Sequence, residues 1–293
     1  MSIIDGILQG AIQGITEFLP VSSDGHVTLY QHLTGLSGEG SLFFTLMLHL
    51  GTLVAVFIVY WREILALIFE FFHMISDLFA RRFTRSRMND DRNMVIMLIV
   101  ATLPLLGFVF LKDWVTKITE DSDIVVEGLC FLYTSVLLFF GAKCVKGRKG
   151  PGEMTAKDAL IVGVFQGTAI MPGISRSGST ISSGLLLGYS KKYIVRFSFI
   201  LGIPAILGAS VFELKDALEA GVVIQWAPLI AGVITAMVFG VICIKLIEYL
   251  VVSDKFQIFA YYTFALGLLT IAAGIVEHVT GQNIVQVVGG LFR

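Results

Sequence analysis

The chain has 293 residues, of which 56% are hydrophobic and 15% are charged, and its formal net charge at pH 7 is −1. A single soluble core cannot hide that much apolar surface, so the composition excludes an ordinary soluble globular protein and indicates an integral membrane protein whose remaining apolar surface faces lipid. The near-zero net charge gives no support to a nucleic-acid partner.

The first segment, residues 1–36, is predicted to be a re-entrant helical hairpin. Its apolar sequence is broken at Pro20, next to serines and charged residues, and each half is too short to cross a bilayer. The break lies in the sequence QGITEFLPVSSDGH, residues 13–26, which we call the first tip. Gln13 and Glu17 are four residues apart on one helical face, so both side chains can point at one bound ion.

Three membrane-spanning helices are predicted next, at residues 42–60, 94–111 and 124–142, because each apolar run reaches the roughly 17–25 residues that a span requires. Residues 61–79 instead mix acidic and basic residues with aromatic ones. This pattern predicts an amphipathic helix that lies in the inner membrane interface.

Basic residues are concentrated in alternate loops, which places these loops on the cytoplasmic side. Loops 80–93 and 143–157 each carry five Arg or Lys residues, and Lys191, Lys192 and Arg196 precede the next predicted span. The intervening loops are acidic or balanced and therefore belong outside. This alternation of cytoplasmic and external loops requires the first hairpin to begin and end outside.

Residues 157–190 are predicted to form a second re-entrant hairpin, which begins and ends on the cytoplasmic side. The segment is broken at Pro172 and Gly173, within the sequence QGTAIMPGISRSGST, residues 166–180, which we call the second tip. Three further spans are predicted at residues 194–213, 226–247 and 256–276. The chain is thus expected to be an all-α membrane protein with six spans and two hairpins in one domain, residues 1–293.

A shift of 153 residues aligns the two hairpins without a gap and pairs several polar and glycine positions. The pairs include Asp5 with Asp158, Gly10 with Gly163, Gln13 with Gln166, Ser22 with Ser175, and Gly35 with Gly188. The distribution of basic residues in the loops indicates that the paired spans cross the membrane in opposite directions. We therefore predict an inverted repeat with halves of approximately 1–79 and 157–220. Such repeats build their site near mid-membrane from broken helices, so the two tips should meet there.

The two tips have the features of an anion-binding site. A new half-helix starts after each break, and its first amide N–H groups are free and carry a partial positive charge. Arg176 adds a planar fork of donors that suits phosphate oxygens. An isolated charge at membrane depth costs about 2.5–3.5 kcal/mol, so charged residues in the tips are expected to have partners or a function.

Structural roles compete with these functional ones. Glu17 and Arg176 could form an ion pair that holds the tips together. Asp24 could cap the half-helix that follows it, as could the serines before it. His26 could be an ordinary hydrogen-bonded histidine. Three other histidines lack polar neighbours in the sequence, and a structural role is preferred for them: His49, His73 and His278.

Both tips resemble the signature motifs of the bacterial undecaprenyl-pyrophosphate phosphatases, the BacA/UppP-type bacitracin-resistance family. The order of the motifs, the chain length and the apolar profile of nearly the whole chain are also similar. The resemblance implies a phosphatase that converts the C55 polyprenyl pyrophosphate to the monophosphate lipid carrier of peptidoglycan synthesis plus inorganic phosphate. It implies a multi-pass protein of the bacterial plasma membrane, with the active site facing outside. Membrane lipids and the lipid substrate are the expected partners, and a homodimer is left open.

The resemblance also implies roles for individual residues. The catalytic residues would be Glu17, Ser23, His26 and Arg176. The substrate phosphates would be bound by Ser22, Ser175, Arg176, Ser177 and Thr180. Mg²⁺, or another hard divalent cation such as Ca²⁺, would be held by Glu17 and Gln13, with Asp24 as a further candidate ligand. Either Ser23 or His26 would be the nucleophile and the other the base.

Asp24 is where the chain departs from the family, which usually has Thr at this position. Its carboxylate is expected either to cap a helix or to tune metal binding beside Glu17. Two other functions compete with the phosphatase. A transporter or flippase for lipids or small molecules could use the same inverted-repeat architecture, and an inactive relative could bind a phospholipid alone. The cluster of Ser, His, Glu and Arg is more than binding requires and favours the enzyme.

Overall fold

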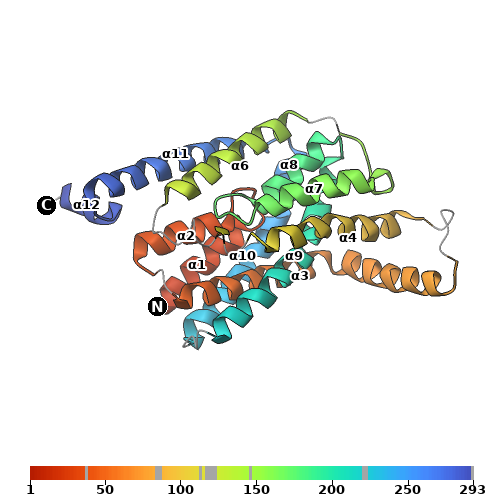
Figure 1. Ribbon diagram of the computed structural model, residues 1–293, viewed down its shortest axis with the longest axis horizontal. Coiled ribbons are helices and arrows are strands. Elements are labelled where there is room, and N and C mark those ends of the chain that lie inside the picture. Colours follow the sequence, from red (N-terminus) through yellow and green to blue (C-terminus); the bar gives the residue numbers. More distant parts are fainter. Residues whose placement is uncertain are drawn as a thin grey trace.

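The computed structural model describes residues 1–36, 39–82, 88–111, 114–115, 124–144, 147–219 and 224–291. This part of the chain is helical apart from turns and one isolated bridge between Lys149 and Tyr189, in agreement with the predicted all-α class. Its α-helices (Figure 1) are α1 (Ile3–Thr16), α2 (Ser23–Thr34), α3 (Glu39–Phe79), α4 (Asp90–Val109), α6 (Val125–Lys143), α7 (Ala156–Thr168), α8 (Arg176–Leu186), α9 (Lys191–Glu219), α10 (Trp226–Val252), α11 (Gln257–Thr280) and α12 (Ile284–Leu291). A short 3-10 helix, η2 (Pro151–Glu153), precedes α7.

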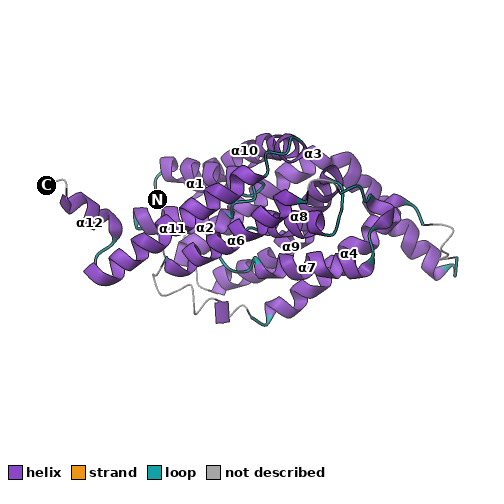
Figure 2. Cartoon of the chain, turned by 90° about the horizontal axis from the view of Figure 1, so that it is seen from above, coloured by secondary structure: helices purple, strands orange, loops and turns teal. Residues whose placement is uncertain are grey.

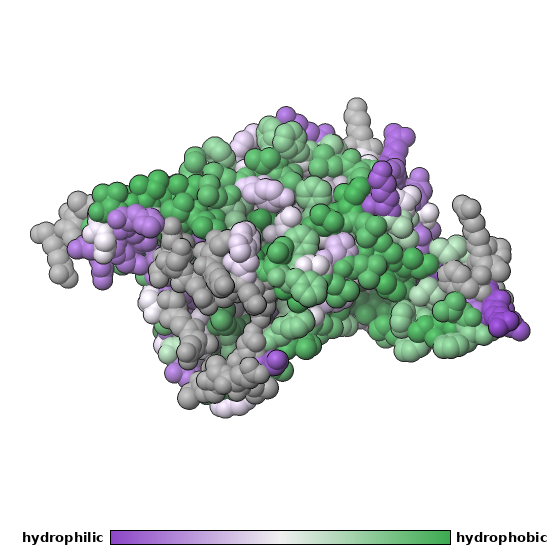
Figure 3. Space-filling model, viewed as in Figure 1, coloured by the Kyte–Doolittle hydropathy of each residue, from purple (hydrophilic) through white to green (hydrophobic). Residues whose placement is uncertain are grey.

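Six helices among the described residues are long and apolar enough to cross a membrane, which confirms the predicted number. They are Gly40–Phe79, Asp90–Val109, Val125–Lys143, Lys191–Phe212, Trp226–Val252 and Gln257–Thr280. Figure 3 shows apolar residues over most of the visible face, with hydrophilic residues gathered toward its edges. In Figure 2 the helices form an elongated bundle, and α12 lies beyond one end of it.

The helix α3 has a kink at the boundary that the sequence predicted. Its 41 residues comprise two helices that meet at Tyr60, whose backbone angles are non-helical (φ −107°, ψ 22°). The segment 61–79 is therefore a helix of its own that follows the first span. Beyond this bend, Glu70 and Asp77 form ion pairs with Arg92 of α4, at 2.6 and 3.0 Å. Whether residues 61–79 lie in the membrane interface stays a prediction.

The second span begins earlier than expected, at Asp90 and not at residue 94. Asn89 caps it, since its side chain accepts a hydrogen bond from the backbone N–H of Arg92 at 2.6 Å. Asp90 and Asp91 occupy the first turn, where negative charge is favourable. The prediction followed the apolar run, which excludes the charged residues of the first helical turn. It therefore placed the start of the helix too late.

Two helix pairs carry the tips: α1 with α2, and α7 with α8. Their bounds correspond under the 153-residue shift, because α1 and α7 start at Ile3 and Ala156, and α2 and α8 start at Ser23 and Arg176. Their first helices also start with the same capping box. It is formed by Ser2 with Asp5 in α1 and by Thr155 with Asp158 in α7.

Each pair packs against a helix from the other half of the chain. α1 lies against α10, and α7 lies against α4. The approach is close: a Cβ atom on Gly10 would lie 2.3 Å from the carbonyl oxygen of Gly232, and one on Gly163 would lie 2.2 Å from that of Ala101. Small residues at equivalent positions therefore permit both helix contacts.

An apolar core anchors the first tip. Phe18 is fully buried and packs edge-on against Phe199 of α9, with ring centroids 5.3 Å apart. Further fully buried residues of α9 and α10, including Phe197, Leu201 and Ile244, belong to the same core. Glu17 follows α1 directly and precedes Phe18. Burial of the Phe18 ring therefore constrains the position of the Glu17 carboxylate.

Candidate functional site

The two tips are joined by hydrogen bonds, as the sequence predicted. The backbone N–H of Gly173 in the second tip donates to Ser22 Oγ at 3.1 Å. Ser22 also caps α2, accepting from the N–H of Gly25 at 3.4 Å, and has a left-handed backbone (φ 70°). Such a conformation is costly for a residue other than glycine, which indicates that the contact between the tips holds Ser22 in place.

Gly173 is constrained by the same contact. Its φ is +96°, and a Cβ atom would lie 2.5 Å from the carbonyl oxygen of Glu127 on α6. The second tip therefore passes too close to α6 for any side chain at this position. The carbonyl of Gly173 accepts a hydrogen bond from Thr134 Oγ1 at 2.8 Å, which fixes the turn further.

The expected phosphate-binding residues of the second tip lie in its buried interior. Ser175 caps α8 by accepting from the N–H of Gly178 at 3.0 Å, and its hydroxyl lies 3.3 Å from that of Ser177. Ser177 Oγ donates to the backbone carbonyl of Leu19 in the first tip at 3.4 Å. Thr180 Oγ1 lies 2.6 Å from Ser198 Oγ. These contacts hold the tips in register, and a direct role in phosphate binding stays a prediction.

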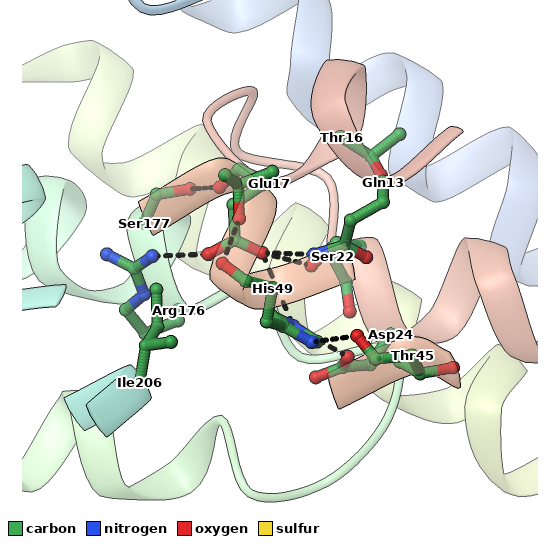
Figure 4. Close-up of polar contacts among 12 residues, drawn as sticks. Gln13, Thr16, Glu17, Ser22, Asp24, Thr45, His49, Arg176, Ser177 and Ile206 are labelled. Atoms are coloured by element: carbon green, nitrogen blue, oxygen red, sulfur yellow. Dashed lines mark hydrogen bonds and ion pairs between the residues drawn. The ribbon is translucent and has the colours of Figure 1, made fainter. Parts of the chain in front are cut away.

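Glu17 is the centre of the polar contacts between the tips (Figure 4). Its Oε1 accepts a hydrogen bond from the guanidinium of Arg176 at 2.5 Å. Its Oε2 accepts from Gln13 Nε2 at 2.9 Å and from Ser23 Oγ at 2.7 Å, and lies 3.5 Å from His49 Nε2. Its side chain is only 5% exposed. Donors from α1, α2, α3 and α8 therefore compensate the buried carboxylate.

Arg176, the first residue of α8, lies at the junction of both tips. Besides its ion pair with Glu17, its guanidinium donates to the backbone carbonyl of Ser198 at 3.3 Å. The predicted structural role, an ion pair that joins the tips, is thus present. Removing one partner from a buried pair typically costs about 3–5 kcal/mol, because the other charge is left uncompensated.

His49 was missed by the sequence reasoning, which wrongly assigned it no polar company. Its Nδ1 donates to the backbone carbonyl of Thr45 at 3.0 Å, and its Nε2 lies 3.2 Å from Asp24 Oδ1 and 3.5 Å from Glu17 Oε2. The partners come from α2 and the end of α1, so the pattern around His49 in α3 gave no hint of them. The available signal was that two ionisable residues at membrane depth, Asp24 and His49, both required a partner.

Asp24 does not cap α2, because Ser22 does. Its carboxylate instead pairs with His49, and its side chain is 47% exposed whereas that of Glu17 is 5% exposed. Asp24 therefore lies at the accessible side of the cluster and Glu17 at the buried side. The capping hypothesis for Asp24 was wrong, while its effect on a metal stays open to experiment.

His26 is set apart from this cluster. Its Nδ1 donates to the carbonyl of Ser22 at 2.6 Å, and its Nε2 lies 2.7 Å from the hydroxyl of Tyr262 on α11. The ring is stacked on Tyr262 (centroids 5.7 Å apart) and meets Phe131 edge-on. Among the described residues, no hydrogen bond joins His26 to Ser23 or Glu17, so His26 has the contacts of a structural histidine.

One buried oxygen in the cluster has no hydrogen-bond partner among the residues that the structure describes. Gln13 is fully buried, and its Oε1 is unpaired although its Nε2 is bonded to Glu17. An amide oxygen beside a carboxylate suits a hard divalent cation, which takes oxygen ligands and commonly shares them with substrate phosphates. No group of three or more His, Cys, Asp or Glu residues that could hold a metal occurs in the described part of the chain. Gln13 and Glu17 thus fit a cation completed by substrate, whereas Asp24 faces His49.

Comparison with known proteins shows the family to which the chain belongs. Residues 6–269, which include both tips, match the family model described as bacitracin resistance protein BacA. An undecaprenyl-diphosphatase from Alkaliphilus metalliredigens is 43% identical over 274 residues, covering 92% of this chain and 98% of that protein. The undecaprenyl-diphosphatase of Methanosphaera stadtmanae is 39% identical over 94% of this chain and 99% of its own length. The chain therefore belongs to the BacA family of bacitracin resistance proteins.

Proposed function

We infer that this protein is an undecaprenyl-diphosphatase. It hydrolyses the terminal phosphoanhydride bond of undecaprenyl pyrophosphate, releasing inorganic phosphate and leaving the monophosphate lipid that is reused as a carrier in cell-wall synthesis. The observation that supports this best is the cluster of Glu17, Ser23 and Arg176, held between two helix starts. Relatives named for this activity match 92% or more of the chain.

The proposed setting is the plasma membrane, with both helix pairs as re-entrant hairpins of an inverted repeat. The matching bounds of α1 and α7, the shared capping boxes and the exchanged packing on α10 and α4 support this arrangement. It brings two helix N-termini to mid-membrane, where free amides can bind the pyrophosphate while the isoprenoid chain stays in lipid. We assign the site to the outer side, as the resemblance implies.

In the proposed reaction, Ser23 is the nucleophile. Its Oγ attacks the terminal phosphorus, its proton passes to Glu17 Oε2 at 2.7 Å, and the bond from phosphorus to the bridging oxygen breaks. The electron pair of that bond leaves with the lipid monophosphate, and water then hydrolyses the phosphoserine. Ser23 is favoured over His26 because both ring nitrogens of His26 already have other partners.

Arg176 and the first amides of α2 and α8 are proposed to stabilise the charge that develops on the transferring phosphoryl group. The guanidinium keeps its hydrogen bond to Glu17 and offers its remaining N–H groups to oxygens of the substrate phosphate. Gln13 and Glu17 are the proposed ligands of Mg²⁺ or a similar cation, which when bound would neutralise phosphate charge. His26 is proposed to fix the carbonyl of Ser22, at the start of α2.

The test is phosphate release from undecaprenyl pyrophosphate by the purified protein in detergent with Mg²⁺. The expected products are inorganic phosphate and undecaprenyl monophosphate in equal amounts. The Arg176→Ala variant, purified in the same way, controls for contaminating phosphatases. Wild-type protein that binds the lipid but releases no more phosphate than this variant would contradict the assignment and favour a binding or transport protein.

A further inference from the structure

His49 contacts both carboxylates of the site, and this carries an inference beyond the roles assigned above. We propose that Asp24 and His49 form a positioning pair: Asp24 orients the imidazole of His49, and His49 in turn holds the Glu17 carboxylate beside Ser23. The inference rests on the proposed function and adds a residue from α3 to a site that is otherwise built by the two tips. It also gives Asp24 an indirect role in place of metal binding.

The hydrogen-bond geometry defines the direction of action. The Nδ1 of His49 donates to the carbonyl of Thr45, one turn earlier in α3, so the ring is anchored to its own helix. Its Nε2 then faces two carboxylate oxygens, Asp24 Oδ1 at 3.2 Å and Glu17 Oε2 at 3.5 Å. Ionised carboxylates only accept hydrogen bonds, so Nε2–H donates to Asp24 at the shorter distance and also lies in ion-pair contact with Glu17.

The charges in the cluster agree with this arrangement. Arg176 lies on the Oε1 side of Glu17, and His49 lies on the Oε2 side together with Asp24 (Figure 4). The His49 ring thus lies within 3.5 Å of both carboxylates and separates Asp24 from Glu17 on this side. Without His49, Asp24 and Glu17 would be like charges sharing one site, which is unfavourable.

The same geometry argues against Asp24 as a direct metal ligand. A cation shared by the two carboxylates would need the position that Nε2 of His49 now occupies between them. Gln13 contacts the same Glu17 oxygen through its Nε2, and its Oε1 is buried without a hydrogen-bond partner among the described residues. Because that oxygen is not engaged whereas Asp24 Oδ1 is paired with His49, metal binding is assigned to Gln13 and Glu17, and the positioning role to Asp24 and His49.

The test is a double-mutant cycle with Asp24→Asn, His49→Gln and both together. Two quantities are measured: kcat and KM for phosphate release, and the melting temperature of each purified variant without substrate or metal. Each single variant is expected to lower kcat about tenfold with a smaller change in KM, because Glu17 is less well oriented toward Ser23. The double variant should be no worse than His49→Gln alone, and the melting temperatures should be coupled in the same way.

His73→Gln is the matched control, because His73 is an exposed histidine on the same helix. Combined with Asp24→Asn, it should change neither kcat nor the melting temperature beyond the effect of Asp24→Asn. Additive effects of Asp24→Asn and His49→Gln on both quantities would overturn the positioning pair. A second result would also overturn it: Asp24→Asn raises the Mg²⁺ concentration for half-maximal activity, and raises it equally when His49→Gln is also present. That result would make Asp24 a metal ligand. A wild-type protein without activity would instead overturn the proposed function, and with it the catalytic role of the pair.

Discussion

The first and second tips share an equivalent helix cap but carry different side chains after it. Ser22 and Ser175 occupy equivalent positions, and each caps its helix through a glycine N–H three residues on. After this cap, the first tip continues with Ser23 and Asp24, while the second continues with Arg176 and Ser177. The first tip thus carries a hydroxyl and an acidic side chain after its cap, whereas the second carries a guanidinium and a hydroxyl.

The two glutamines sharpen this contrast. Gln13 is bonded to Glu17 and leaves one oxygen unpaired, whereas Gln166, its counterpart, has both side-chain polar atoms buried without a hydrogen-bond partner among the described residues. In the second tip, Ile170 stands where the first has Glu17. The comparison teaches that the repeat reproduces helix starts and helix contacts, while the charged groups of the site are distributed asymmetrically.

Apart from replacement of the proposed nucleophile Ser23, the largest effect is expected at the ion pair between the two tips. Arg176→Lys keeps the positive charge but loses the planar fork that contacts Glu17 and can also contact phosphate. We expect kcat/KM for phosphate release to fall about 10²–10³-fold, the scale of removing one preorganised donor. Correct insertion is checked by an unchanged elution volume in size-exclusion chromatography. Turnover close to that of the wild type would remove Arg176 from the phosphate contacts.

A smaller effect, which distinguishes the two tips, is expected at the corresponding residues Gln13 and Gln166. Activity should be lost in excess EDTA and restored by Mg²⁺. Gln13→Leu should then raise the Mg²⁺ concentration for half-maximal activity about tenfold, equivalent to about 1.4 kcal/mol, because one oxygen ligand is lost. Gln166→Leu, at the corresponding position of the second tip, should leave the metal titration unchanged. Equal shifts in both variants would mean that the tips do not differ in metal binding, and full activity in EDTA would exclude a metal requirement.

The turns of the tips differ as well, which predicts an effect on stability. Gly173→Ala places a methyl group against the Glu127 carbonyl in a left-handed conformation, and we expect a loss of about 1–3 kcal/mol. Gly35→Ala is the control: Gly35 is also left-handed, with φ +68°, but a Cβ atom there would meet open space. Thermal unfolding in detergent should show the larger decrease for Gly173→Ala. Equal decreases would mean that backbone strain alone acts, without the close approach to α6.

The smallest effect is expected at the edge of the first tip. Tyr262→Phe removes the hydroxyl bonded to His26 Nε2 but keeps the stacked ring. Since His26 is assigned a structural role, kcat should fall only a few-fold, within the net value of about 0.5–1.5 kcal/mol for one hydrogen bond. A much larger loss in kcat would return His26 to the catalytic groups.

The sequence was sufficient to predict much of this site, and its limits have physical causes. Six spans, both breaks and the contact between Glu17 and Arg176 follow from apolar length, from Pro20 and Pro172, and from the cost of a buried charge. His49 was missed because its partners lie on other helices, and the cost of unpaired ionisable residues in apolar segments was the one signal that pointed to them. The bonding of Ser23 to Glu17 and of His26 to Tyr262 likewise depends on tertiary packing.

The division of labour between the tips is tested most directly by Ser23→Ala, measured as phosphate release from undecaprenyl pyrophosphate at saturating Mg²⁺. Ser183→Ala in α8 is the matched control, since its buried hydroxyl donates to the backbone carbonyl of Thr180 within the same helix at 3.1 Å. The account predicts that Ser23→Ala still binds the lipid but releases no phosphate above background, while Ser183→Ala remains active. Phosphate release by Ser23→Ala at a rate close to that of the wild type would contradict it.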